Sequence, residues 1–537
     1  MSKRSADKAP TKKPAKTRSV GTREFSRRAQ AAQRRAARRR TARVRAHRRS
    51  MPSFSPAEML RRIPTAAWLC ALVACLNAVC WSIVTPPFQV PDEPAHFAYV
   101  KQLAETGRLP TSSADFNAAE EILALVDLRY YKVRQHPEER TVSSQSEQNT
   151  LQRDVALAAE SPEKGSSAAG VATSEPPLYY ALEAVPYSLA GTVLSRLQLM
   201  RLLSALMAGV TALFTFLFVR EALSGVRWAW VTGGLAVALA PLLGFISGAV
   251  NPDAMLFAVS AALFYCLARA FRRGFTPRMG VAIGAVTAIG FLTKLNFIGF
   301  VPGVFLGSII LAVRAARTSR RSACRSLALA WGIAASPATL YAIVNILSNH
   351  PVLGLATGAF ESRYASALHE INYIWQFYLP RLPGTANDFP GLFTTRQLWF
   401  NGYVGLYGWL DTTFPGWVYS VALIPAAAIA ALCIRGLIAS RAALSHRLPE
   451  LVVYALMAIG VMTLVGAASY SGFPARDAEF AEARYLLPML PLLAAVLAMA
   501  ARGAGRRWGP AVGALIVVLF LAHDIFSQLL VVSRYYG

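Results

Sequence analysis

Two acidic residues and a histidine directly follow the first apolar stretch of the chain. The segment TPPFQVPDEPAHFAYV, residues 85–100, holds Asp92, Glu93 and His96 between prolines. A carboxylate so placed can take the proton of a hydroxyl group as the hydroxyl oxygen attacks a carbon atom. We therefore predict that Asp92 and Glu93 are catalytic. Because no second histidine stands nearby, His96 is interpreted as a hydrogen-bonding residue that contacts substrate and not as a metal ligand.

Further ionisable and aromatic residues stand at the edges of later apolar stretches. They are Glu175 and Tyr179 in SEPPLYYAL, Asp253 in NPDAML, Lys294 in LTKLNF, and Arg484 with Tyr485 in ARYLLPMLPLL. Charged groups at the edge of the hydrocarbon layer are costly unless they are paired or solvated, so a functional site is the default hypothesis. Lysine and arginine stabilise a departing phosphate. We predict that these six residues bind substrate.

Structural explanations stay open for several of these positions. The acidic pair after the first apolar stretch could consist of ordinary interfacial carboxylates. Asn251 or Asp253 could cap the helix that follows by accepting backbone N–H bonds, and Lys294 and Arg484 could be anchors whose charged ends reach the interface. A divalent cation such as Mg²⁺ or Mn²⁺, held by Asp92 and Asp253, is a further option, although a direct-base mechanism needs none.

The elements that position these residues are membrane helices. Of the 537 residues, 54% are hydrophobic and only 16% are charged, which excludes a soluble protein and indicates a polytopic membrane protein. The net charge of +26 is concentrated in residues 1–62, which hold 21 Lys and Arg against three acidic residues, so nucleic-acid binding is not indicated. The six cysteines lack metal-ligand spacing, and neither disulfides nor structural zinc are expected.

The basic segment 1–62 is predicted to be a largely disordered cytoplasmic tail that orients the first transmembrane helix, residues 63–84. Its part 27–49 could instead become helical on anionic lipids, which would then be binding partners. The apolar stretch that follows ends without a small-x-small cleavage site, so it is interpreted as an uncleaved anchor.

Apolar stretches long enough to cross about 30 Å of hydrocarbon predict an all-α protein with eleven transmembrane helices. They lie at 64–84, 202–219, 228–248, 254–271, 279–313 (two helices), 326–347, 414–434, 451–469, 485–501 and 509–532.

The segment 176–194 decides on which side of the membrane each later residue lies, because it is apolar but contains Glu183 and Pro186. If it does not cross, five short loops with 17 arginines share one side with the basic tail, as cytoplasmic loops do. We therefore interpret it as an amphipathic helix on the outer surface.

This arrangement predicts a plasma-membrane protein with a cytoplasmic N-terminus and an outer C-terminus. A first outer loop spans 85–200 and an aromatic-rich second outer loop spans 348–412. Transmembrane helices fill 201–347 and 413–537.

The motifs quoted above, in order over residues 64–532, resemble those of the bacterial membrane family known as domain of unknown function 2142. More distantly they resemble the GT-C class of membrane glycosyltransferases, which includes the aminoarabinose and protein mannosyl transferases. In that class the first outer loop carries an acidic motif essential for catalysis, which falls here on Asp92 and Glu93.

The resemblance extends to later positions. It implies a second outer acidic position at Asp253, a "TK" position at Lys294 and an "RY" position at Arg484, and it implies that the SEPP helix lies along the membrane. The chain departs from the class by a Ser/Glu-rich insertion before Glu175 and by the lack of a soluble outer C-terminal domain that holds acceptors.

Together these features predict an inverting transfer of a hexose or pentose from a polyprenyl-phosphate carrier to an envelope glycan or lipid. Nucleotide sugars are absent outside the cell, so an outer-face enzyme needs a donor attached to a membrane carrier. Two alternatives remain open: a flippase or exporter of lipid-linked saccharides, and an envelope scaffold without an active site.

Overall fold

The computed structural model describes residues 63–110, 119–136, 138–160, 172–173, 175–347, 367–389, 394–476 and 482–537. The predicted basic tail, 1–62, lies outside the described residues. Residues Thr65–Gly537 form one compact unit, which is almost entirely helical apart from a two-stranded antiparallel hairpin, β1 (Leu406–Tyr407) with β2 (Thr412–Thr413). The class of fold is therefore all-α, as the sequence predicts.

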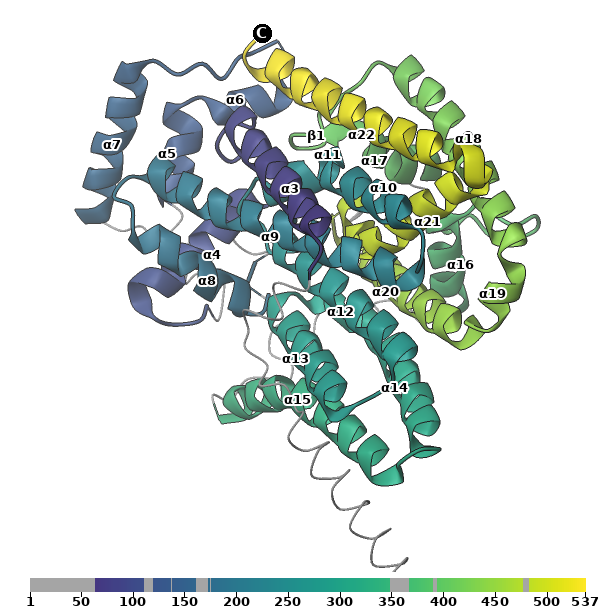
Figure 1. The fold of residues 1–537 in the computed structure, drawn as a ribbon. Helices are drawn as coiled ribbons and strands as arrows, with labels where there is room; N and C mark the ends of the chain where they lie inside the picture. The colour runs from purple at the N-terminus through teal and green to yellow at the C-terminus, as the bar shows by residue number, and fades with distance from the viewer. Residues whose placement is uncertain are drawn as a thin grey trace, which may run out of the picture. The chain divides into compact units, whose positions relative to one another are not determined.

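The first half of the unit contains a long helix, a set of shorter helices and then a series of apolar helices (Figure 1). These are α3 (Thr65–Val84), α4 (Glu93–Thr106), α5 (Ala119–Asp127), α6 (Tyr130–Gln135), α7 (Gln145–Glu160), α8 (Leu178–Ser188), α9 (Val193–Ala222), α10 (Arg227–Ala238), α11 (Pro241–Ser247), α12 (Asp253–Arg273), α13 (Pro277–Thr293), η3 (Leu295–Phe300), α14 (Val301–Ala316) and α15 (Arg320–Leu347).

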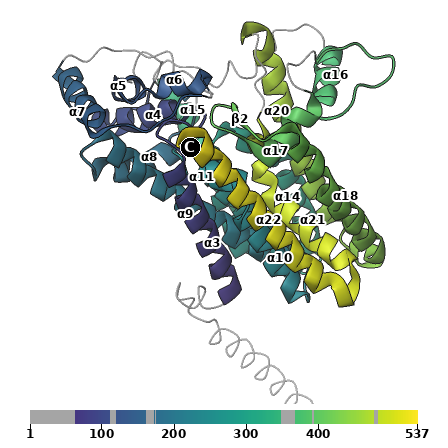
Figure 2. The ribbon, with the colours of Figure 1, turned by 90° about the horizontal axis from the view of Figure 1, so that it is seen from above.

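The second half has the same character. It consists of α16 (Ala367–Tyr378), η5 (Arg396–Asn401), α17 (Gly402–Gly405), the hairpin, α18 (Gly416–Ala439), α19 (Arg441–Ser445), α20 (Leu448–Arg476), η6 (Ala483–Met489), α21 (Leu490–Gly503) and α22 (Gly505–Tyr535). Helix α22 packs along α10 and α21 (Figure 2).

Nine helices in the described part of the chain are long and apolar enough to cross a membrane, and a tenth span results if the bent pair α10–α11 is counted as one. This makes the protein a multi-pass membrane protein. Helix α13 is apolar but has only 17 residues, about the shortest length that crosses the hydrocarbon layer. The sequence-based number of eleven stays a prediction.

The contacts at the helix ends show how successive helices run. Arg201, near the start of α9, donates to the carbonyl oxygen of Ser82 at the end of α3, with a distance of 2.9 Å. Arg272 and Arg273, at the end of α12, pair with Glu221 at the end of α9. Helix α9 is therefore antiparallel to α3 and parallel to α12. The end of the bundle where α3 ends and α9 begins is called the loop end below.

The last helix also ends at the loop end, beside α6 (Figure 1). The backbone N–H of Thr141 donates to the carbonyl oxygen of Tyr535 at 2.9 Å. Arg534 donates to the carbonyl oxygens of Glu139 at 3.0 Å and His136 at 3.2 Å. The end of α22 is therefore attached to the loop segment between α3 and α9, and we call these contacts the C-terminal clamp.

The segment 176–194 forms α8 and the turn before α9. With 11 residues, α8 is too short to cross a membrane, and it packs against α4 and α9. Its Glu183 is fully buried and accepts a hydrogen bond from Ser204 of α9 at 2.8 Å. The acidic residue inside this apolar helix is thus accommodated by a partner in α9.

Candidate functional site

The chain leaves α3 and turns into α4 at Asp92. Asp92 has a left-handed backbone conformation, with φ 66° and ψ −1°, which aspartate tolerates better than most residues. Its carbonyl oxygen accepts the N–H of His96 at 3.0 Å, and Pro94 in the first helical turn suits the helix start. The turn holds the Asp92 side chain in a position where 28% of it is exposed.

The carboxylate of Glu93, next to Asp92 in the chain, has entirely different surroundings. Glu93 is 0% exposed. Arg201 donates two hydrogen bonds to its carboxylate, from Nε to Oε1 at 2.8 Å and from Nη2 to Oε2 at 2.7 Å. The backbone N–H groups of Phe88 and Val250 donate to the same carboxylate at 2.9 Å and 3.1 Å. Glu93 therefore ties α4 to α9 and to the segment after α11, and its oxygen atoms face protein donors.

Two cations and four carboxylates meet at the loop end, and we call this group the charged cluster. Lys294 Nζ lies 2.8 Å from Asp253 and 3.9 Å from Glu175. Arg484 pairs with Asp92, and its Nε lies 2.8 Å from Glu482 and 3.7 Å from Asp253. The cluster thus joins residues from five separate parts of the chain. Within the described residues, no group of three or more His, Cys, Asp or Glu is arranged to hold a metal ion.

Aromatic groups border the charged cluster. Tyr485 accepts a hydrogen bond from Arg484 at 3.3 Å, and its ring centroid lies 5.9 Å from Lys294 Nζ. His96 Nδ1 lies 3.0 Å from the hydroxyl of Tyr180, which stacks on Tyr99. Burial lowers the pKa of His96 to about 3 against the opposing effect of Asp92. The imidazole is therefore neutral at physiological pH and acts as a hydrogen-bonding group.

The ring of Tyr179 packs edge-on against Tyr180, with centroids 5.4 Å apart, but its hydroxyl contacts a different group. Its hydroxyl is 2.8 Å from Ser204 Oγ, which in turn donates to Glu183. The sequence singled out Tyr179, but its neighbour Tyr180 makes the contact with His96. The structure thus brings the other sequence-selected residues together at the start of α4 and places Tyr179 in the packing between α8 and α9.

In NPDAML, Asn251 accepts a backbone N–H bond just before α12, whose N-cap position is Pro252. Its Oδ1 accepts the backbone N–H of Asp253 at 2.9 Å, and its Nδ2 lies 3.5 Å from the carbonyl oxygen of Pro91. The Asp253 carboxylate is left to pair with Lys294. Asn251 therefore lies just before α12 and links its first residue to the turn before α4.

The carboxylates of the cluster differ in their pKa values. Burial raises the pKa of Glu482 to about 7, against the opposing charge of Arg484. For Asp92, burial acts to raise the pKa, but Arg484 and the other positive groups outweigh it and hold the pKa below the ordinary value of 3.8. Burial raises the pKa of Glu175. Near pH 7, Asp92 is ionised and Glu482 is partly protonated.

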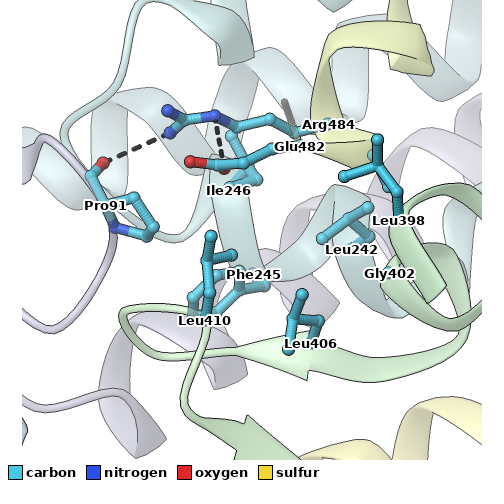
Figure 3. Close-up of a pocket in the computed structure, with 11 residues that line it drawn as sticks. Pro91, Leu242, Phe245, Ile246, Leu398, Gly402, Leu406, Leu410, Glu482 and Arg484 are labelled. Atoms are coloured by element: carbon cyan, nitrogen blue, oxygen red, sulfur yellow. Dashed lines mark hydrogen bonds and ion pairs between the residues drawn. The ribbon is translucent and has the colours of Figure 1, made fainter. Parts of the chain in front are cut away.

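A small pocket opens onto the cluster (Figure 3). Glu482 and Arg484 form its polar side, and Arg484 donates to the carbonyl oxygen of Pro91 at 3.3 Å. Residues of α11 and of the segment around β1 form its apolar side, among them Phe245 and Leu406. A ligand in this pocket would contact charged groups on one side only.

An apolar groove lies on the other side of η6. It has an empty volume of about 900 Å³ and is lined by α17, α20, η6 and α21, with Tyr403, Met462 and Leu493 among its residues. Ala483, next to Arg484, lines both this groove and the small pocket. An apolar surface within the membrane-spanning helices therefore adjoins the charged cluster.

Residues 62–493 match the family model described as predicted membrane protein (DUF2142). The chain belongs to this family. Every residue of the charged cluster lies within the matched part of this DUF2142 protein. No curated protein and no solved structure matches the chain.

Sequence reasoning missed three residues of this DUF2142 site: Arg201, Glu482 and Tyr180. Arg201 had a detectable signal, because an arginine inside a long apolar stretch needs a buried partner. Glu482 follows other acidic residues in the sequence, and Tyr180 follows another tyrosine. In both cases the sequence offers neighbouring residues of similar chemistry and no way to choose between them.

Proposed function

We propose that the protein transfers a sugar from a polyprenyl-phosphate carrier to an envelope glycan or lipid at the outer face of the plasma membrane, in the manner of GT-C enzymes. The observation that supports this best is that Arg484 lines the small pocket while its neighbour Ala483 lines both that pocket and the apolar groove. A lipid-linked donor combines a charged phosphate with a long apolar chain. Lys294 and Arg484 can donate to the phosphate, and burial favours the neutral forms of Glu482 and Glu175 beside them. The adjoining groove suits the chain.

In this proposal Asp92 is the general base and the two cations receive the phosphate. The acceptor hydroxyl attacks the anomeric carbon, the bond from that carbon to the phosphate oxygen breaks, and the hydroxyl proton moves to the Asp92 carboxylate. The departing phosphate gains negative charge, which Lys294 and Arg484 stabilise. Attack from the face opposite the leaving group inverts the anomeric configuration.

The ion pair between Arg484 and Asp92 gives this scheme a donor-dependent step. Without donor, Arg484 is paired with Asp92 and lowers the basicity of that carboxylate. A donor phosphate draws the guanidinium away, so the pKa of Asp92 rises toward its ordinary value. The base is thereby strengthened when the donor is bound.

Glu93 has a positioning role in this proposal. Its carboxylate is occupied by Arg201 and by two backbone N–H groups, so it holds α4 in place and leaves the proton transfer to Asp92.

The proposed sidedness places the N-terminal tail in the cytoplasm, against anionic lipids, and the loop end outside. The attachment of α22 to the loop segment puts the end of that helix at the same end as the charged cluster, which supports an outer C-terminus.

The decisive experiment replaces Asp92 with Asn in a deletion strain and compares the envelope glycans by mass spectrometry. We expect normal amounts of protein in the membrane and loss of one sugar substituent. Asp154→Asn, on α7 outside the cluster, is the matched control and should restore the glycan. A full glycan profile with Asp92→Asn would contradict the proposal, as would a labelled glycolipid that changes leaflet in reconstituted vesicles without a covalent change.

A further inference from the structure

A second cleft lies in the loop segment, at the opposite end of α4 from the charged cluster. It has an empty volume of about 980 Å³ and is bounded by α4, α5, α7 and the start of α9. Glu105, near the end of α4, lines the cleft, and Glu93 begins the same helix. These two positions are about 18 Å apart at the helical rise of about 1.5 Å per residue. The cleft is therefore a separate site.

The polar groups that line this cleft can both donate and accept hydrogen bonds. Arg196 and the amides of Gln148 and Gln152 donate, and the carboxylates of Glu105 and Glu120 accept. Gln152 is exposed, so its amide is open to a ligand.

The charges in and around the cleft balance one another. Glu120 pairs with Lys101 at 2.9 Å and with Arg196 at 3.5 Å, and Glu105 lies 4.0 Å from Arg196. Burial raises the pKa of Glu121, the third carboxyl group beside Lys101, to about 8, so this group is mostly neutral at pH 7 and two charged carboxylates face two cations. A phosphate or a metal ion would find no excess of opposite charge, whereas a neutral ligand with several hydroxyl groups matches the mixture of donors and acceptors.

Arg196 is held in place before any ligand binds. Its Nε donates to the carbonyl oxygen of Ala190 at 3.2 Å, its Nη1 donates to the hydroxyl of Tyr187 at 2.8 Å, and its guanidinium lies 4.4 Å from the ring centroid of Tyr187. A fixed guanidinium loses little conformational freedom on binding, which favours affinity.

Apolar side chains complete the cleft. Leu151 and Val155 of α7 face it together with Val193 and Leu194 of α9. Ligand sites typically combine an apolar lining with a few placed polar groups, and a sugar ring offers C–H faces to the former and hydroxyls to the latter.

From this combination we infer that the cleft between α4, α5, α7 and α9 is a binding site for a neutral saccharide. Binding itself does not depend on the proposed transfer. If the protein is the proposed transferase, which this further step assumes, the cleft holds the remote sugar units of an extended acceptor glycan while the acceptor end reacts near Asp92.

The test uses the full chain purified in detergent and saturation-transfer-difference NMR. The probes are cellopentaose, maltopentaose and the neutral glycan fraction released from the envelope of the source organism, with inorganic phosphate and Mg²⁺ as competitors. We expect saturation transfer to at least one of the saccharide probes, unaffected by either competitor. Absence of transfer to all three probes, or displacement by phosphate or Mg²⁺, would overturn the inference.

A steric variant locates the site. Ala156→Trp fills the cleft from α7 and is expected to weaken saccharide binding by about tenfold or more. Leu157→Trp, on the same helix at a side chain that is 59% exposed and does not line the cleft, is the matched control and should bind normally. Equal binding by both variants would refute this location.

The proposed sugar transfer and the proposed saccharide site can be refuted independently of each other. Asp92→Asn should abolish transfer and leave saccharide binding intact. If Asp92→Asn leaves the envelope glycan unchanged while Ala156→Trp no longer binds the saccharide, the proposed function is refuted and the saccharide site is supported.

Discussion

Arg484 forms an ion pair with Asp92, although the two residues are 392 positions apart in the chain. The pair joins the turn before α4 to the start of η6, and Arg484 lines the small pocket. Arg484 is thus placed to influence both the basicity of Asp92 and the binding of an anionic ligand, and these two effects can be measured separately.

Replacement of Arg484 with Gln should alter the pH dependence of transfer. The pKa of Asp92 lies below its ordinary value because of the guanidinium, so in the variant the acidic limb of the pH profile should move to higher pH. Transfer itself should fall by about 100-fold, as on loss of one group that stabilises a developing charge. The measurement is kcat/KM for the lipid-linked donor in membrane vesicles as a function of pH, because kcat/KM reports the donor-free enzyme, in which Arg484 is paired with Asp92. An acidic limb at an unchanged pH would argue against Asp92 as the base.

Glu482 should make phosphate binding sensitive to pH near neutrality. Its pKa of about 7 means that it gains a negative charge as the pH rises through this value, and that charge repels a bound phosphate. Between pH 6 and 8, about one unit on either side of this pKa, the affinity for undecaprenyl phosphate should therefore fall more steeply in the wild-type protein than in Glu482→Gln. Microscale thermophoresis in detergent gives both curves. Parallel curves would count against a role for Glu482 in phosphate binding.

The apolar groove should select for long lipid chains. Ala458→Trp, on α20, fills the groove and should weaken the binding of undecaprenyl phosphate by about tenfold, with little effect on farnesyl phosphate. Ile459→Trp, at a neighbouring side chain that is 58% exposed and lies outside the groove, is the control. If both chain lengths lose affinity equally, the groove does not hold the chain.

The buried pair of Arg201 and Glu93 should be a major contributor to stability. Arg201→Leu leaves the Glu93 carboxylate buried without its charged partner, which typically costs about 3–5 kcal/mol. Thermal unfolding in detergent should show a large fall in Tm for this variant and a partial recovery in Arg201→Leu/Glu93→Gln. Arg153→Leu, on the exposed side of α7, should leave Tm unchanged. A Tm of Arg201→Leu equal to that of the wild type would disprove the structural role.

The topology can be tested at the turn after α9. A reporter inserted at Gly225, which stands in an exposed turn, should be active only as a cytoplasmic fusion. Activity of an exterior reporter at this position would place the charged cluster in the cytoplasm and remove the basis for an outer-face transferase.

Much of the charged cluster was predictable because each member stands where an apolar stretch meets a polar turn. Asp92, Asp253, Lys294 and Arg484 could be placed at one end of the bundle by counting crossings, without knowledge of packing. The polytopic helical architecture was likewise predictable, because the apolar stretches are long enough to cross the hydrocarbon layer.

Contacts between side chains were not predictable to the same degree. Asp92 and Glu93 look equivalent in sequence, yet Asp92 is partly exposed and pairs with Arg484, whereas Glu93 is enclosed by Arg201. Successive helical residues point about 100° apart, so Tyr179 and Tyr180 contact different partners. The sequence does not reveal the rotation of α8 about its axis, because both tyrosines are buried.

The C-terminal clamp has a consequence for biogenesis. A membrane chain is made from its N-terminus, so the loop segment around Glu139 and Thr141 emerges long before Arg534 and Tyr535, its partners. Arg484, the partner of Asp92, is also synthesised long after Asp92. The loop end, which carries the charged cluster, can therefore mature only after almost the whole polypeptide has been inserted. A ribosome-bound intermediate that lacks α22 should present this loop to proteases that the finished protein resists.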